Sequence, residues 1–460
     1  MPLPTILSGN VASATAGGYE IANSCRFNRP DSPYMHITPG SDGDLKIFTV
    51  SFWVKRGIAN TGSSGTDRQV IFSNATNDQI SFHNDNLCFL EDGTDSAITN
   101  MKFRDFSSWF HIVMAFDTSQ STNTNRQKVY VNGKQIDQST GFSTMSYVAQ
   151  DLEMGFGKGS EMMSVGRSEY DDNRHFDGYL AEFYYINGTM LDHTSFGEFD
   201  EDSPTIWKPK KFTGSFGTNG FYLDFEDSGD LGDDESGNGN DFTEVNLAAA
   251  DQATDTPTNN FCTLNPLAAA NNQPTFSEGN CQSVSSGAWY GTLGTMGVSA
   301  GKWYWEVKVT TTGGNFHGVI ADYVNFDDAT VYNEVGATSY TSDGSGEMYY
   351  GADTTTADYG SVAQNAITGI ALNMDDKQIS IYNNGSAIVS NFALDDATNL
   401  DFVLPFGFEW SATVQYNFGG CSAFALSSAA QDENGYGNFE YSPPSGYLAL
   451  CTKNLGSDGG

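Results

Sequence analysis

The feature that most constrains this chain is the alternation of large apolar and polar residues in short runs. FTVSFWVKR (48–56) and WFHIVMAFD (109–117) show it most clearly, and the same pattern recurs in QVIFS (69–73), KVYVNGKQI (128–136) and YLAEFYYING (179–188). A period of two residues sends successive side chains to opposite faces of a strand, so each run predicts a strand with one buried face. Asn132-Gly133 interrupts the fourth run, and Asn-Gly supplies the positive φ angles of a tight hairpin turn.

The second half of the chain repeats this pattern. Its alternating runs are GKWYWEVKVT (301–310), GIALNMDDKQISIYNNGSAI (369–388) and FVLPFGFEW (402–410). VYVNGKQI (129–136) and IYNNGSAI (381–388) share an aromatic-x-Asn-Gly hairpin late in each block, which indicates two sandwiches of related architecture. We therefore predict an all-β chain of two antiparallel β-sandwiches joined by an irregular connector.

Residues 193–262 differ in composition from both blocks. They hold the basic cluster Lys208, Lys210 and Lys211 and then the acidic, Gly-rich stretch DFEDSGDLGDDESGNGNDF, which is typical of a connector that wraps a surface. The first residues are small and uncharged, and they form either a frayed terminus or an arm that orders against a partner. The expected division is a docking arm (1–18), a first sandwich (19–195), a connector (196–264), a second sandwich (265–456) and a flexible tail (457–460).

The charge of the chain excludes several classes of partner. There are 57 acidic residues against 21 basic ones, which gives a formal net charge of -36. Such a chain repels phosphate backbones and anionic membrane surfaces, so we expect neither nucleic-acid binding nor membrane insertion.

Aromatic residues make up 13% of the sequence, which is far more than in a disordered chain, so we expect the chain to fold.

The termini and cysteines suggest where the chain is made. The sequence MPLPTILSGNVASATAGG has no basic region and no apolar core, so we expect no secretory signal. Six cysteines occur without CxxC spacing, which favours thiols in a reducing cytoplasm over a disulfide framework or a zinc site. A bridge between Cys262 and Cys281 stays open as an alternative.

The first block resembles the laminin G-like, concanavalin A-like jelly rolls found as lectin and glucanase modules. The residues that carry the resemblance are FTVSFWVKR, WFHIVMAFDTS, KVYVNGKQI, SVGRS (164–168) and FDGYLAEFYYING. The order of these motifs, over about 170 residues, is that of the family. The resemblance implies a β-sandwich whose loops can bind carbohydrate.

The second block resembles a SPRY domain, a concanavalin-like sandwich that serves as a protein-interaction module. GKWYWEV (301–307), GIALNMDDKQISIYNNG, VLPFGFEW and PPSGYLALCTKNL carry this resemblance. The opening LPTILSGNVASATAGGYEIANSCRFN, SGNGNDFT and DTPTNNFCTLNPL are similar to segments of large structural proteins of marine tailed phages. The resemblance implies a virion component that is made in the host cytoplasm.

Residue types that carry catalysis are present but not in catalytic patterns. Glucanases on this fold use an E-x-D-x-x-E strand, and the nearest string, beginning at Glu198, ends in Ser203 where the acid/base Glu belongs. The six histidines are isolated, and His111, within the strand run 109–117, is expected to be structural. We therefore expect the chain not to be an enzyme.

Two acidic loops are candidates for binding Ca²⁺. Asp234 and Asn238 lie in a string that begins like an EF-hand loop, but Val245 stands where the bidentate Glu belongs, so an Asx-rich turn is the alternative. The second loop contains Tyr170, Asp171, Asp172 and Asn173. In such a loop the aromatic ring can stack on a sugar, and Asp171 and Asp172 can hold its hydroxyls or a bridging Ca²⁺.

These observations lead to two hypotheses. The first is a non-enzymatic phage virion protein (a fibre, an appendage or a capsid decoration) that docks to other virion proteins and to itself and adheres to host-surface glycans. In this hypothesis Tyr170, Asp171, Asp172 and Asn173 are the ligand-binding residues, and Ca²⁺ is the only cofactor expected. The second is a carbohydrate-binding or glucanase-like protein secreted by a bacterium. The absence of a secretory signal and of a catalytic pair counts against it.

Overall fold

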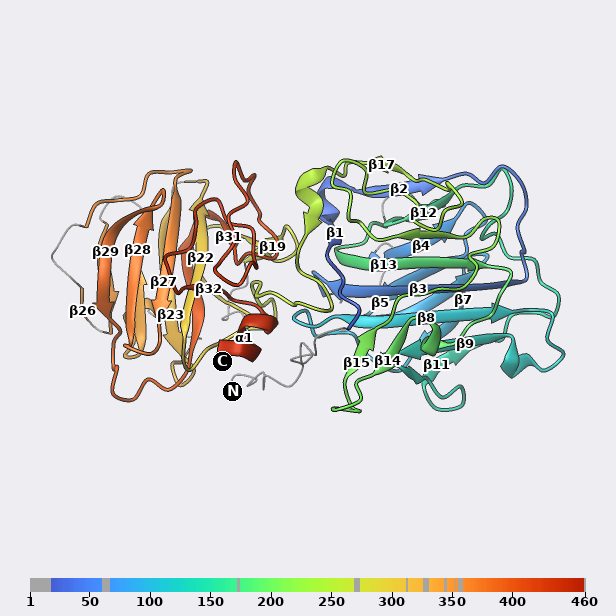
Figure 1. The fold of residues 1–460 in the computed structure, drawn as a ribbon, viewed down its shortest axis with the longest axis horizontal. Helices are drawn as coiled ribbons and strands as arrows, with labels where there is room; N and C mark the ends of the chain where they lie inside the picture. The colour runs from blue at the N-terminus through green and yellow to red at the C-terminus, as the bar shows by residue number, and fades with distance from the viewer. Residues whose placement is uncertain are drawn as a thin grey trace. The chain divides into compact units, whose positions relative to one another are not determined.

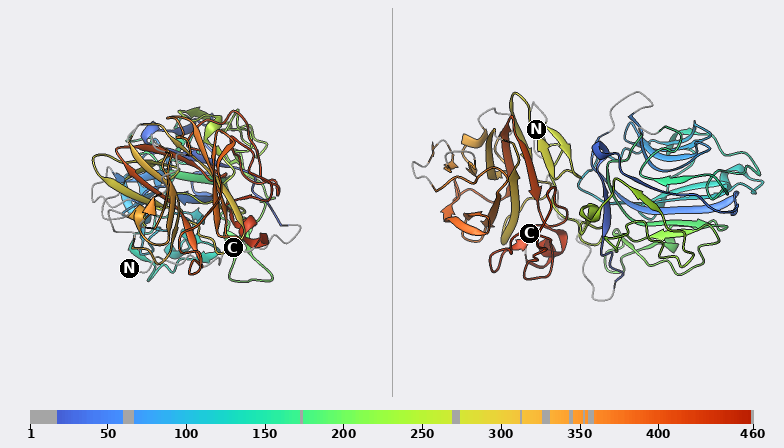
Figure 2. Two further views of the ribbon diagram at one scale, coloured as in Figure 1. Left: turned by 90° about the vertical axis from the view of Figure 1, so that its left-hand side faces the viewer. Right: turned by 90° about the horizontal axis from the view of Figure 1, so that it is seen from above.

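The computed structural model describes residues 18–59, 67–171, 174–268, 274–311, 313–325, 331–342, 346–351, 353–354 and 359–458 (Figure 1). The chain divides into two compact units between Thr258 and Asn259. Within the described residues the one α-helix is α1 (Thr452–Asp458), and strands form the framework of both units. The predicted all-β class is therefore confirmed, and Figure 2 shows the strands from two further directions.

The first unit is a sandwich of two eight-stranded sheets, which we call sheets A and B. Sheet A has the order β10-β9-β8-β3-β13-β1-β18, with β16 also paired to β13; the bounds are β1 Ser24–Phe27, β3 Ile47–Arg56, β8 Phe110–Asp117, β9 Gln127–Val131, β10 Lys134–Gln135, β13 Gly178–Asn187, β16 Phe221–Leu223 and β18 Gln252–Ala253. Sheet B has the order β11-β7-β6-β5-β4-β12-β2-β17; the bounds are β2 Tyr34–Ile37, β4 Gln69–Asn74, β5 Gln79–His83, β6 Asn86–Glu91, β7 Thr94–Thr99, β11 Phe142–Met145, β12 Met163–Val165 and β17 Thr243–Val245.

The alternating runs of the first unit form strands, as predicted. The prediction that each strand has one buried face is wrong for β3, because both of its faces are buried. In β3, Phe48 and Phe52 face the core between the sheets, whereas Ser51 and Lys55 point to the opposite face and are buried as well. An aromatic cluster that includes Tyr184 covers part of this opposite face. Sheet A therefore has two buried faces.

Strand β13 organises sheet A because it pairs with three strands. Along one edge it pairs with β3, while the other edge pairs with β1 at residues 178–180 and with β16 at 183–185. Glu182 lies between these two pairings, in a bulge where its φ angle is 51°. Its carboxylate accepts hydrogen bonds from the hydroxyls of Tyr222 (2.7 Å), Tyr19 (2.9 Å) and Tyr184. The bulge thus ties the start of the described chain and β16 to the centre of the sheet.

The residues expected to form a connector belong largely to the first unit. β16, β17 and β18 all lie after residue 196, and they pair with β13, β2 and β1 respectively. A separate pair, β14 (Gly197–Phe199) and β15 (Trp207–Pro209), precedes them. The sequence did not predict these strands. Each is only two or three residues long, which is too short to show an alternating pattern.

The second unit is also a sandwich of two sheets, which we call sheets C and D. Sheet C has the order β19-β20-β31-β22-β27-β28-β29, with β32 paired to β22; the bounds are β19 Thr275–Ser277, β20 Gln282–Val284, β22 Lys302–Val309, β27 Ile367–Asn373, β28 Gln378–Asn383, β29 Ser386–Ala393, β31 Thr413–Asn417 and β32 Leu448–Ala449. Sheet D has the order β21-β30-β23-β24-β25-β26; the bounds are β21 Trp289–Leu293, β23 Gly314–Ala321, β24 Ala337–Tyr340, β25 Met348–Tyr350, β26 Asp353–Thr354 and β30 Val403–Trp410.

Both predicted Asn-Gly hairpins are confirmed. Asn132 and Gly133 have φ angles of 45° and 75°, and Asn384 and Gly385 have 45° and 77°. Positive φ at both central residues is the geometry of a tight type I′ hairpin. Asn-Gly therefore sets the turn between β9 and β10 and that between β28 and β29.

All six cysteines are buried thiols and none forms a disulfide, so Cys262 and Cys281 are not bridged. In the described part of the chain, no helix has the length and apolar character needed to cross a membrane.

A buried carboxyl group links the two sheets of the second unit. Glu409 of β30 is fully buried and accepts hydrogen bonds from the hydroxyls of Ser283 (2.6 Å) and Tyr416 (2.9 Å), which belong to sheet C. His317 of β23 lies beside the same tyrosine, with its Nδ1 3.4 Å from the hydroxyl. Burial raises the pKa of Glu409 to about 7, although the two hydroxyl donors favour the charged form.

We predict that Glu409→Gln weakens the dependence of stability on pH. The pKa of Glu409 lies above its ordinary value of 4.5, so the folded state binds this proton more tightly than the unfolded state. The stabilisation is fully present below about pH 4.5 and is lost as the pH rises through 7. Between pH 5 and pH 8 the variant should gain roughly 2 kcal/mol relative to wild type.

Denaturant unfolding at the two pH values measures this difference. Asp401→Asn, which changes an exposed carboxylate of the same unit, is the control. A difference between wild type and Glu409→Gln that stays constant from pH 5 to pH 8 would contradict the prediction.

Candidate binding face of the first domain

The outer face of sheet B carries an unusual concentration of polar side chains. In β5 the alternation sends Ile80 and Phe82 into the core, so Gln79, Ser81 and His83 lie on the opposite face. These residue types can bind a polar ligand through side chains held by a rigid strand.

Arg68, immediately before β4, extends across this face. Its Nη1 donates to the hydroxyl of Ser81 (3.2 Å), and its Nη2 donates to Oδ2 of Asp95 (3.1 Å) and lies 3.4 Å from Nδ1 of His83. The Arg68 side chain is only 5% exposed, whereas that of Asp95 is 33% exposed. The Arg68 side chain is therefore fixed by its hydrogen bonds, and its partner Asp95 is partly exposed to solvent.

The loop 166–175 adjoins this face and is held by side-chain hydrogen bonds. The hydroxyl of Ser168 accepts hydrogen bonds from Nε2 of Gln79 (3.0 Å) and from the backbone N–H groups of Tyr170 (3.3 Å) and Asp171 (3.0 Å). Tyr170 itself is 65% exposed. The loop thus presents an aromatic ring to solvent from a fixed backbone.

Three charged contacts involve residues of this loop. Asp171 pairs with Arg174 (2.8 Å), and Arg167 pairs with Glu169 (2.9 Å). The Arg167 guanidinium also stacks over the ring of Tyr34, 3.6 Å from its centre. We call the residues Arg68, Gln79, Ser81, His83 and Asp95, together with the described part of the loop 166–175, the binding face.

The sequence prediction covers only part of this face. Tyr170 and Asp171 lie next to each other on the fixed loop, whereas Asp172 and Asn173 fall outside the described residues. The alternation in QISFH could have placed His83 on the outer face, but it could not show that Arg68 meets it there.

The other predicted loop is closed by its own hydrogen bonds. The carboxylate of Asp234 accepts hydrogen bonds from the backbone N–H groups of Tyr222, Ser236 and Asn240 and from the hydroxyl of Ser236, at 2.8–2.9 Å. Asn238 donates its amide to the carbonyls of Gly217 and Gly220. This is the geometry of an Asx-rich turn.

Calcium at either loop stays a prediction, and the hydrogen bonds do not favour it. The lone pairs of Asp234 are used by the turn, and Asp171 is already paired with Arg174. Among the residues that the structure describes, no group of three or more acidic, histidine or cysteine side chains is arranged to hold a metal ion.

Two family models match the chain. Residues 30–193 match the model described as the concanavalin A-like lectin/glucanases superfamily, and residues 302–421 match that of the SPRY domain. The chain carries a concanavalin A-like domain followed by a SPRY domain. The binding face belongs to the concanavalin A-like domain, and the family resemblance read from the sequence is confirmed for both domains.

Two solved structures are similar to parts of this chain. The SPRY domain of human HERC1 is 19% identical, with 35% of this chain and 99% of that chain covered and a TM-score of 0.27. The native heptameric SAP-like pentraxin from Limulus polyphemus is 15% identical, with coverage of 38% and 80% and a TM-score of 0.28. No curated protein matches the chain.

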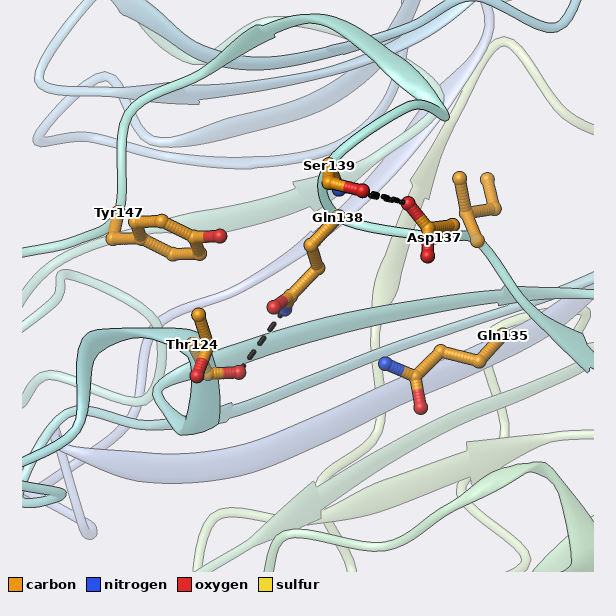
Figure 3. Close-up of a pocket in the computed structure, with 7 residues that line it drawn as sticks. Thr124, Gln135, Asp137, Gln138, Ser139 and Tyr147 are labelled. Carbon is orange, nitrogen blue, oxygen red and sulfur yellow. Dashed lines mark hydrogen bonds between the residues drawn. The ribbon is translucent and has the colours of Figure 1, made fainter.

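A concave region lies in the concanavalin A-like domain, beyond the hairpin of β9 and β10 (Figure 3). It is an open cleft of about 480 Å³ lined by Thr124, Gln135, Ile136, Asp137, Gln138, Ser139 and Tyr147. Gln138 donates to the backbone carbonyls of Thr124 and Gln127, and Asp137 accepts hydrogen bonds from Ser139 and Thr140, which lower its pKa to about 2. The side chains of Asp137 and Gln138 thus form hydrogen bonds with neighbouring residues of the protein.

A serine–histidine pair in the same domain lacks the arrangement of a nucleophile and its base. The hydroxyl of Ser51 lies 2.9 Å from Nε2 of His111, but the indole N–H of Trp207 donates to Nδ1 (3.0 Å). Nδ1 therefore accepts, and in the neutral ring Nε2 carries the proton and cannot act as a base towards the serine. Burial lowers the pKa of His111 to about 3, which keeps the ring neutral. The histidine is structural.

The acidic string after β14 also has a structural role. Asp200 accepts hydrogen bonds from the backbone N–H groups of Asp202 (3.0 Å) and Ser203 (2.9 Å), and Lys208 lies 3.5 Å from its other oxygen. Its carboxylate closes a turn, and Lys208 also lies 3.7 Å from the carboxylate of Glu198.

We predict that Asp234→Ala destabilises the concanavalin A-like domain to the same extent with and without calcium. Removing an acceptor for four donors should reduce the free energy of unfolding by about 1–3 kcal/mol. Thermal unfolding in EDTA and in excess CaCl₂ measures the effect, and Asp227→Asn in the neighbouring acidic stretch is the control. A loss that occurs only in calcium would instead identify Asp234 as a metal ligand.

Proposed function

We propose that this chain is a non-enzymatic structural protein of a phage virion that binds host-surface glycans through its concanavalin A-like domain. It would serve as a fibre, an appendage or a capsid decoration. The observation that carries the glycan-binding role is the exposed Tyr170 ring on a loop fixed by Ser168 and Gln79. Both domains are of kinds that serve in binding.

The binding face offers what recognition of a sugar requires. An aromatic ring can stack on the apolar face of a pyranose, and neighbouring charged groups can hydrogen-bond its hydroxyls. Asp171 and Arg174 lie beside Tyr170 and supply an acceptor and donors. Because Ser168 holds the backbone of this loop, little conformational entropy is lost on binding.

Two observations support a non-enzymatic role. Ser51 and His111 are buried, and their tautomer opposes proton transfer from the serine. Asp200 in the acidic string uses one carboxylate oxygen to close a turn, and the other lies 3.5 Å from Lys208.

The SPRY domain would dock to other virion proteins or to a second copy of the chain. Residues 259–460 contain four lysines and no arginine against 20 acidic residues, so their surface favours a partner with basic groups. The arm 1–18, of which the structure describes only residue 18, is the second proposed contact with the virion.

We predict that Tyr170→Ala weakens binding to host-surface oligosaccharides. Loss of the stacking ring should raise Kd about tenfold, which corresponds to ~1.4 kcal/mol. A glycan array with the full chain measures this. Met101→Ala, which removes another exposed apolar side chain of the same domain, should have no effect. Equal binding by wild type and Tyr170→Ala would refute the role of the loop.

We also predict that the chain is present in purified virions from its source. A mass-spectrometric inventory of the particles, combined with cryo-electron microscopy, would detect it and locate it on the head or the tail. Its absence from particles whose other structural proteins are all recovered would exclude the virion role and leave glycan binding as a separate property.

A further inference from the structure

Five buried polar atoms without a hydrogen-bond partner gather on the binding face. They are Nε of Arg68, Oε1 of Gln79, Nε2 of His83, Oδ1 of Asp95 and Nε of Arg174. Each such atom destabilises a folded protein by about 1–3 kcal/mol, and native structures contain few of them. Their concentration on one face of one sheet points to a ligand that would satisfy them.

The five residues form a connected group. Gln79 and His83 project from the same face of β5, and Arg68 reaches both His83 and Asp95. Arg174 joins from the loop, because its partner Asp171 is held by the same Ser168 hydroxyl that binds Gln79. The side chains of Asp95 and Arg174 are 33% and 19% exposed, so a ligand can approach from their side.

The chemistry of the unpartnered atoms defines the ligand. Nη2 of Arg68 can only donate, so Nδ1 of His83 accepts and its Nε2 carries the proton. Burial and the nearby Arg68 lower the pKa of His83, which keeps the ring neutral. The face therefore has unpartnered donors on Arg68, His83 and Arg174, and unpartnered acceptors on Gln79 and Asp95.

We propose that the binding face recognises a sugar unit that carries a carboxylate or sulfate group. Arg68 and Arg174 contact the anion, since a planar guanidinium matches the oxygens of such groups. Asp95, whose side chain is 33% exposed, accepts hydrogen bonds from neighbouring hydroxyls. This inference rests on the proposed glycan-binding function and names the class of glycan.

The distribution of charge supports a small anionic group over a polyanion. All eight arginines lie between Arg26 and Arg174, in a chain whose net charge is -36. At physiological ionic strength the repulsion from distant carboxylates is screened beyond about 8 Å, so the contact with Arg68 and Arg174 determines local affinity. An extended polyphosphate would meet the whole acidic surface, which disfavours nucleic acid.

Isothermal titration calorimetry with the full chain tests this inference. The probes are an oligosaccharide with a single uronic-acid unit, its neutral methyl ester and the same backbone with a single sulfate group. We expect both anionic probes to bind about tenfold more tightly than the ester, and the preference to fall with added salt. Arg68→Gln and Arg174→Gln should each abolish the preference. Arg104→Gln, which removes the same charge from a side chain that is 59% exposed, should preserve it.

The outcomes separate the two proposals. Equal affinity for the ester and the anionic probes, or a preference that survives in both arginine variants, overturns this inference and leaves glycan binding intact. Failure of wild type to bind any of the probes, or any oligosaccharide of the array, overturns both. Circular dichroism checks that the variants are folded, and Arg174→Gln is the decisive one because its side chain is less buried than that of Arg68.

Discussion

The bulge at Glu182 is the interaction on which the rest of the concanavalin A-like domain depends. It allows the edge of β13 to pair first with β1 and then with β16, strands that are almost two hundred residues apart in the sequence. A carboxylate that is 3% exposed needs partners, and the hydroxyls of Tyr19, Tyr184 and Tyr222 supply them. The segment after β13 thereby becomes part of the sandwich and covers sheet A.

The SPRY domain uses buried carboxyl groups for the same purpose. Glu409 joins sheet D to sheet C through Ser283 and Tyr416. On the opposite face of sheet C, Glu306 accepts hydrogen bonds from the backbone N–H groups of Glu440 (3.0 Å) and Tyr441 (2.8 Å), which fixes the segment that follows β31. Such groups destabilise a core when unpaired and specify one arrangement when fully paired.

The binding face lies on the other sheet of the domain. Residues 196–258 cover part of sheet A, whereas on the outer face of sheet B the side chains of His83 and Asp95 are part-exposed next to the fixed loop. Ser168 links the loop to this sheet, because its hydroxyl accepts hydrogen bonds from Nε2 of Gln79 and from the backbone N–H of Tyr170. A rigid scaffold that presents an exposed tyrosine on a fixed loop suits binding.

The sequence by itself determined the strands and their turns. The alternation in 48–56 and 402–410 and the two Asn-Gly pairs depend on neighbouring residues only, so they give β3, β30 and both hairpins correctly. Tyr170 and Asp171 could be proposed because they are adjacent in the chain. Only the tertiary structure decided that β16 to β18 complete the first sandwich, and that Arg68, His83, Asp95 and Arg174 share one face. Pairing between distant strands, and the contacts of long side chains across a sheet, leave no local pattern in the sequence.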